Sequence, residues 1–206
     1  TGVVQTLISK EWDITLEEIF AQTVSELKAD GIGMEKLAEV PAELAAFFKL
    51  RLKHILQEEQ IRYDLIEAVL GNDIGNVSTL IAKGKVLEAK RTSTDFKENI
   101  EALSRVLNIS SKAEQAGEIE AALFENDSEK HLYEQYLSVS AKLHKHLSEE
   151  EYYEMLVSLK SAINEYFDHT MVMADDAAIK QNRLNQMAAL AQLIKKFANV
   201  NEIIVK

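Results

Sequence analysis

Apolar residues recur at helical spacing along most of the chain, and the first clear segment lies between Thr15 and Gly31. Its apolar residues are Leu16, Ile19, Phe20, Val24 and Leu27. Residues three or four apart share one face of a helix, so this stripe predicts an amphipathic helix. Thr15 and Glu18 have the spacing of a capping box, and Gly31 is a typical stop signal. The segment is therefore predicted to be a capped surface helix.

The same spacing predicts further helices along the rest of the chain. They begin near Pro41, Tyr63, Asn76, Asp95, Ser128, Ser148 and Asp176. Ser148 and Glu151 form a second capping box, and Asp175 and Asp176 place negative charge where the dipole of the final helix favours it. The stretch 114–127 has weak periodicity and is predicted to be a loop. We find no alternating strand pattern of useful length, which indicates an all-α bundle of about seven or eight helices.

The composition supports this class and excludes several others. One Pro and 7 Gly in 206 residues are too few for the many turns of an all-β protein. The absence of Cys excludes disulfides, iron–sulfur clusters and thiol catalysis. The sequence contains neither a long apolar span nor a signal-peptide pattern, so we expect a cytoplasmic protein without a membrane anchor. Because the chain begins with Thr1, we also expect it to be a piece of a longer protein.

The net charge of −11 is distributed unevenly. Residues 1–46 carry 3 basic and 9 acidic side chains, and residues 113–170 carry 4 basic and 13 acidic ones. The two remaining segments are mildly positive and contain all five arginines, Arg51, Arg62, Arg91, Arg105 and Arg183. Arginine pairs with phosphate and stacks on bases, so the acidic total does not exclude RNA binding. Chance clustering with ordinary surface ion pairs is the alternative.

Motifs for catalysis are missing. The sequence has no phosphate-binding glycine loop and no local Ser/His/Asp set. His144 and His146 are two residues apart, so on a helix they would point to different sides and could not easily share a metal ion. We therefore expect no catalytic residue, metal site or cofactor in this chain.

Four ordered motifs resemble the C-terminal region of bacterial glycyl-tRNA synthetase β subunits. The matching residues are Phe47, Phe48, Arg51 and Leu52; then Arg62, Tyr63, Asp64, Ile66, Ala68, Val69 and Leu70; then Phe167, Asp168, Met171, Val172, Met173 and Asp176; and finally Asn182, Arg183 and Leu184. The resemblance extends from about Ala42 to the end of the chain. The sequence departs from the family at Gln60, where Gly is frequent, and at Lys180, where Arg is common.

The resemblance implies a helical domain like the DALR anticodon-binding domain over residues 41–206, preceded by a helical lead-in over residues 1–40. The family implies binding of the anticodon stem-loop of tRNA(Gly), with the α subunit and the rest of the β subunit as further partners and neither DNA nor a membrane among them. Glycylation, which uses ATP and Mg, would be catalysed elsewhere in the α2β2 enzyme. A helical protein–protein docking module without anticodon readout is the alternative.

Within this framework we predict one RNA-binding face. Its candidate residues are Arg51, Lys53, Arg62, Arg105 and Arg183 for phosphates and bases, Asn108 and Asn182 for amide readout, and Tyr63 for stacking. Two alternatives stay open, namely that Arg51 and Arg62 form structural ion pairs with Asp64 or Glu67, and that Tyr63 is buried in the core. The predicted core residues from the motifs are Phe47, Phe48, Val69, Leu70, Phe167, Met171 and Met173.

Overall fold

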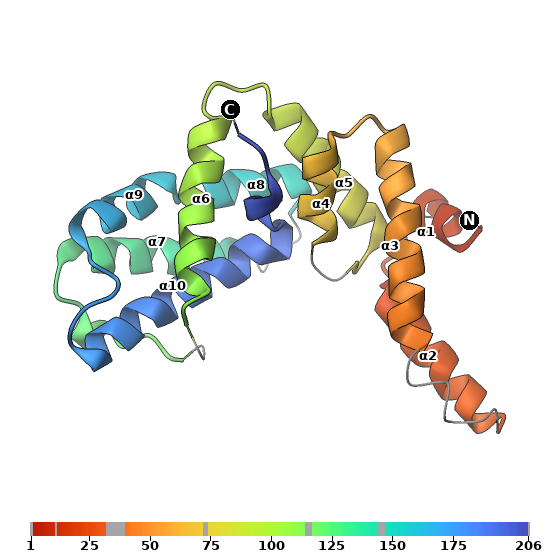
Figure 1. Ribbon diagram of the computed structural model, residues 1–206, viewed down its shortest axis with the longest axis horizontal. Coiled ribbons are helices and arrows are strands. Elements are labelled where there is room, and N and C mark those ends of the chain that lie inside the picture. Colours follow the sequence, from red (N-terminus) through yellow and green to blue (C-terminus); the bar gives the residue numbers. More distant parts are fainter. Residues whose placement is uncertain are drawn as a thin grey trace. The chain divides into compact units, whose positions relative to one another are not determined.

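The computed structural model describes residues 2–10, 12–31, 40–71, 74–113, 117–143 and 147–205. These residues form ten α-helices, two short 3-10 helices and no strand, which confirms the predicted all-α class (Figure 1). Contacts divide the chain into two compact units, residues 1–88 and residues 89–206. We describe each unit by itself.

The first unit contains α1 (Gly2–Lys10), α2 (Leu16–Ala29), α3 (Val40–Glu58), α4 (Tyr63–Leu70) and most of α5 (Val77–Lys90). Phe20 of α2 packs on Phe48 of α3 with ring centroids 5.4 Å apart. The Glu17 carboxylate accepts a hydrogen bond from the Ile74 backbone N–H at 3.1 Å, which ties the start of α2 to the loop before α5. Because α2 packs on α3, the sequence-based boundary at residue 40 does not coincide with the division after residue 88.

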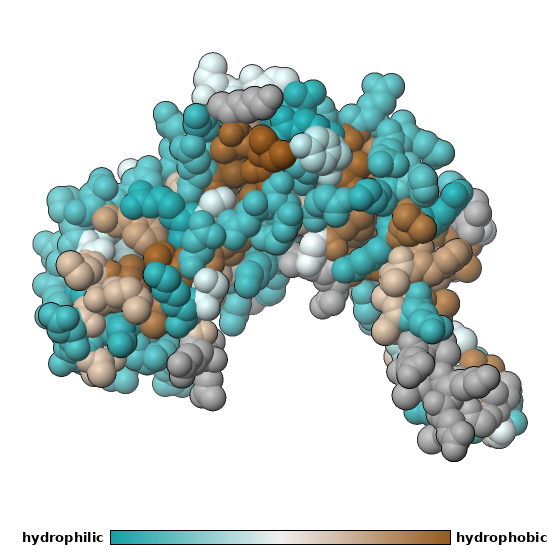
Figure 2. Space-filling model, viewed as in Figure 1, coloured by the Kyte–Doolittle hydropathy of each residue, from teal (hydrophilic) through white to brown (hydrophobic). Residues whose placement is uncertain are grey.

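The second unit contains α6 (Phe96–Ser110), η1 (Ala121–Leu123), α7 (Asp127–Leu143), α8 (Glu149–Val157), α9 (Lys160–His169), α10 (Ala177–Phe197) and η2 (Val200–Glu202). The long helix α10 packs against α6, α7 and α8, and α9 packs against α6 and α7. Fully buried Leu132, Ile163 and Leu190 come from three of these helices. In Figure 2, hydrophilic residues cover much of the visible surface, and hydrophobic ones show between them.

The predicted helix ends are confirmed in detail. The Thr15 hydroxyl accepts from the Glu18 N–H at 3.1 Å while the Thr15 N–H donates to the Glu18 carboxylate at 2.9 Å. Ser148 and Glu151 form the same reciprocal pair. Asp176 caps α10, accepting from the N–H of the second and third residues of that helix. The caps are local, so a sequence pattern is sufficient to predict them.

The sequence predicts one helix start, near Ser148, before the start near Asp176, but the structure has two helices in this stretch. The chain turns at Ser158 and Leu159, which separate α8 from α9. The Ser158 hydroxyl donates to the carbonyl of Met155 at 2.7 Å, and such side-chain bonds compete with the helical backbone pattern. Leu159 is completely buried at this turn. The interruption is one reason why the described residues hold more helices than predicted.

Candidate nucleic-acid interface

Arg105 is the candidate whose position best suits RNA contact. It lies on the solvent-facing stripe of α6, and its guanidinium carbon is 4.4 Å from the ring centroid of Phe167 on α9. No carboxylate forms an ion pair with Arg105 in the part of the chain that the structure describes. A guanidinium that lies over one aromatic ring can still offer its other side to a base or a phosphate. Arg105 is thus an oriented cation without a competing anion.

Asn108 continues the Arg105 stripe on α6, and Lys112 follows in the turn just after that helix. All three side chains are exposed. The Asn108 side-chain oxygen accepts from the Asn201 amide of η2 at 3.1 Å, which leaves its own amide hydrogens available. Lys112 was not among the predicted site residues, and it lies two residues beyond the end of α6, where helical spacing does not predict its direction. Phe167 was also missed, because we assigned it to the core, and the structure leaves it half-exposed.

Arg51 and Tyr63 are the corresponding candidates in the first unit. Arg51 is half-exposed, with no ion pair to another described residue, and Phe47 lies one turn before it on α3 with 59% of its surface exposed. The prediction that Phe47 belongs to the core is therefore wrong. Tyr63 begins α4 and is 61% exposed, which excludes the alternative that it is a core residue. An exposed ring at a helix start is suited to stacking.

Lys53 and Arg62 have structural partners within the first unit. Lys53 forms an ion pair with Glu67 of α4. The Arg62 Nε and Nη2 atoms donate to the two carboxylate oxygens of Asp64 at 2.5 and 2.6 Å, and Asp64 is buried. The hydrogen bond to Asp64 raises the pKa of Arg62. The structural ion pair that we left open for Arg62 is thus present, and both cations keep a partly exposed side chain.

Arg183 lies in the interior of the second unit and not on an exposed face. Its Nη2 donates to Glu129 and Glu125 at 2.8 Å each, its Nε donates to Glu129 at 3.2 Å, and its Nη1 donates to the Met171 carbonyl at 3.1 Å. Only 5% of Arg183 is exposed. This position corrects the prediction that Arg183 faces RNA, because each of its three guanidinium nitrogens already donates to an acceptor inside the unit. Arg183 joins α7, α10 and the loop after α9.

Asn182 is also buried, which corrects its predicted role in amide readout. Its side chain accepts from the Glu120 N–H at 2.8 Å and donates to the Glu120 carbonyl at 3.0 Å. Asn185, one turn later, makes the equivalent pair with the Gly117 N–H at 3.1 Å and the Glu118 carbonyl at 2.8 Å. The two amides hold the segment 117–120 against α10 much as a neighbouring strand would. They are structural anchors of a loop.

The loop after α9 contains two further departures from the predicted core. Met171 is 75% exposed and Met173 is also exposed, whereas Val172 between them is buried. Phe48, Val69 and Leu70 are buried as predicted. The chain bends at Val172 and Met173 after α9 ends, and only the middle residue of the Met–Val–Met sequence is buried there. Helical spacing could not reveal this, because the segment is not helical.

Neither a metal centre nor a membrane span is found in the described part of the chain. No group of three or more His, Cys, Asp or Glu side chains there could hold a metal ion, and His144 and His146 lie outside the described residues. Within the described ranges, no helix is both long and apolar enough to cross a bilayer.

Two family models match this sequence. The model of the DALR anticodon binding domain matches residues 100–203, slightly more than half of the chain. The chain therefore belongs to the DALR anticodon binding domain family. The model of the glycyl-tRNA synthetase beta subunit matches residues 1–71, a stretch that includes the N-terminal residues for which the motifs indicated no resemblance.

Curated relatives agree with both matches. The glycine–tRNA ligase beta subunits of Halalkalibacterium halodurans and Bacillus subtilis are 40% and 41% identical over 208 and 211 residues, and that of Listeria monocytogenes is 35% identical over 205 residues. Each alignment covers 100% of this chain. The chain spans about 30% of the length of these relatives. The predicted resemblance to the C-terminal region of this subunit is confirmed.

Proposed function

We propose that this chain is the C-terminal tRNA-binding region of a glycyl-tRNA synthetase β subunit and that it holds the anticodon stem-loop of tRNA(Gly). Membership of the DALR anticodon binding domain family and the similarity to glycine–tRNA ligase beta subunits support this proposal. The rest of the β subunit and the α subunit are its proposed protein partners. Glycylation of the tRNA, with ATP and Mg, belongs to the remainder of this cytoplasmic enzyme.

The contact of the exposed Arg105 guanidinium with the Phe167 ring is the observation that connects the proposal with particular residues. Anticodon bases are unpaired, so they can be splayed out and stacked on a ring or a guanidinium plane. Phe167 fixes the orientation of Arg105 before RNA arrives, which reduces the entropy that binding has to overcome. Asn108 extends the stripe with amide donors, and Lys112 adds one more charge just after α6. In the first unit, Arg51 and Tyr63 offer the same combination of a cation and a ring.

The binding role of Arg105 can be tested with one variant and one matched control. Arg105→Ala removes a charge and a stacking surface, and a stacking contact is worth about 1–3 kcal/mol per base. We expect the affinity for tRNA(Gly) to fall about fivefold or more, with helical content unchanged. Lys142→Ala removes the same charge from an exposed position on α7, within the acidic segment, and is expected to leave the affinity nearly unchanged.

Filter binding and circular dichroism on both variants provide the measurements. Equal affinity of Arg105→Ala and the unaltered chain would reject Arg105 as a contact residue. Equal weakening in both variants would show that net charge, and not this surface, controls binding. The docking-module alternative predicts that neither variant changes the filter-binding signal, because the chain would then not bind tRNA.

A further inference from the structure

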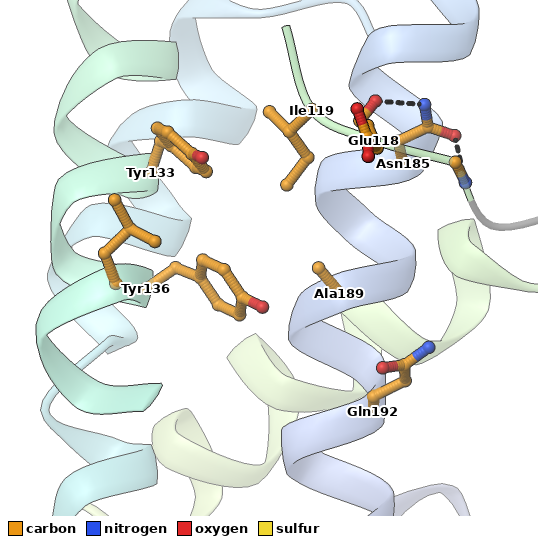
Figure 3. A pocket seen from close by; sticks show the side chains of 9 residues that line it. Glu118, Ile119, Tyr133, Tyr136, Asn185, Ala189 and Gln192 are labelled. Carbon is orange, nitrogen blue, oxygen red and sulfur yellow. Dashed lines mark hydrogen bonds between the residues drawn. The ribbon is translucent and has the colours of Figure 1, made fainter. Parts of the chain in front are cut away.

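A groove of about 500 Å³ lies between α7 and α10 in the second unit. Figure 3 shows Tyr133 and Tyr136 on α7 along one side, Ala189 and Gln192 on α10 along the other, and Ile119 between them at one end. Leu137 also lines the groove and is 47% exposed. The proposed tRNA contacts do not line this groove, so its chemistry has to be explained separately.

The rim of this groove is held in place by buried side chains. The Asn185 side chain accepts a hydrogen bond from the Gly117 N–H and donates one to the Glu118 carbonyl. The Asn182 side chain bonds the N–H and the carbonyl of Glu120. A Cβ atom at residue 117 would lie 2.9 Å from the Asn185 amide nitrogen, so this close approach requires glycine. The Glu118 carboxylate therefore extends from a fixed backbone at the edge of the groove, in a preformed arrangement.

Aromatic faces and a single carboxylate define the chemistry of the groove. The rings of Tyr133 and Tyr136 are nearly parallel, with 19° between their planes and 6.2 Å between their centroids. Phe124 packs edge-on against Tyr133 at 5.5 Å and fixes that ring. Glu118 is the one charged residue among the described lining residues, and its exposed carboxylate has no ion pair with any other described residue. Tyrosine faces and a free carboxylate together favour a cation.

We propose that this groove binds an arginine side chain presented by a partner protein. A planar guanidinium can lie flat on a tyrosine ring while its N–H groups donate to the Glu118 carboxylate. Leu137 at the edge offers an apolar contact to the residues beside the arginine. Glu118, Ile119, Tyr133, Tyr136 and Leu137 of the groove belong to the segment 113–170, which carries 4 basic and 13 acidic residues. This net negative charge favours a basic partner and disfavours phosphates.

Binding of arginine can be measured by NMR titration of the whole chain with capped tripeptides. The probe is acetyl-Gly-Arg-Gly-amide, and its citrulline counterpart has nearly the same shape without the charge. We expect shifts of the Ile119, Tyr136 and Gln192 amide signals with the arginine peptide, and at least about fivefold weaker binding of the citrulline peptide. Cytidine serves as a third probe, because a base could also stack on the two rings.

Two variants assign the binding to this groove. Glu118→Gln, at an exposed position that leaves the backbone anchors intact, is expected to weaken arginine binding at least about fivefold, as is Tyr136→Leu. Glu120→Gln removes a carboxylate two residues away that does not line the groove, and we expect no change. Equal binding of arginine and citrulline, tighter binding of cytidine, or an unchanged Glu118→Gln variant would each overturn the proposal. None of these outcomes depends on whether the chain binds tRNA.

Discussion

Replacing Arg183 separates a structural role from an RNA-binding role. In the structure its guanidinium makes four hydrogen bonds, two of them to Glu129, whose side chain is fully buried. Among the described residues, Arg183→Ala would leave the Glu129 carboxylate with the Glu125 N–H and the Asn126 amide as its remaining donors, at 3.2 and 3.0 Å. An uncompensated buried charge of this kind costs about 3–5 kcal/mol. We expect a loss of that size in the unfolding free energy of the second unit.

Urea denaturation can assign this loss to the second unit. Trp12 is the single tryptophan and lies in the first unit, so its fluorescence follows that unit, while far-UV circular dichroism follows the helices of both. We expect Arg183→Ala to shift the circular-dichroism transition and to leave the Trp12 transition nearly in place. Arg105→Ala, which changes an exposed arginine, should lower the unfolding free energy by at most about 1 kcal/mol, the value of an exposed cation–π contact.

A double-mutant cycle tests the assigned cause. If Arg183→Met leaves the Glu129 charge without its partner, then Glu129→Gln should lower the unfolding free energy less in the Arg183→Met variant than in the unaltered chain. We expect a coupling free energy of about 1–3 kcal/mol. A loss below about 1 kcal/mol for Arg183→Ala, or the absence of coupling with Glu129, would refute the buried ion-pair account. It would also restore Arg183 as a candidate RNA contact.

Two further predictions concern the first unit. Gln60 has a left-handed backbone with φ of 61°, so Gln60→Gly should raise the urea midpoint of the Trp12 transition by the equivalent of about 0.5–1 kcal/mol. The control Gln57→Gly, within α3, should lower this midpoint by the equivalent of about 1 kcal/mol, and equal effects of the two changes would contradict the strain argument. The Thr15 N–H and hydroxyl hold the pKa of Glu18 below its usual value of about 4.5, so the stabilisation is present above that pH and is lost as the pH falls through the lowered pKa. Glu18→Gln, which cannot ionise, should remove this acid-range dependence, and an unchanged stability–pH curve would show that the Glu18 carboxylate of the capping box does not contribute.

Local patterns in the sequence were sufficient to predict the helical class, most helix starts and both capping boxes. These features depend on residues three or four apart, which the sequence displays directly. Phe20 on α2 contacts Phe48 on α3 within the first unit, and because these residues are far apart in sequence, periodicity could not predict that the two helices pack together. Family motifs identified the resemblance, but they did not distinguish residues that maintain the fold from residues that face solvent.

The predicted site shows that distinction most clearly. Asn182 and Arg183 belong to a matching motif, yet both are buried, because Glu120 and Glu129 come from distant segments to meet them. Arg105 and Asn108 were selected by residue type, and the structure leaves both exposed. Which arginine acquires an internal carboxylate depends on tertiary contacts. The binding role of the exposed residues stays a prediction.

Titration of this chain with tRNA(Gly) and with the same tRNA carrying an altered anticodon tests the central claim most directly. The proposed function predicts tighter binding of the unaltered tRNA, with each lost base contact worth about 1–3 kcal/mol. It also predicts that a plot of the logarithm of the binding constant against the logarithm of the salt concentration has a slope of roughly −0.7 to −0.9 for each neutralised phosphate. Equal affinity for the two tRNAs together with a flat salt response would contradict anticodon binding by this region.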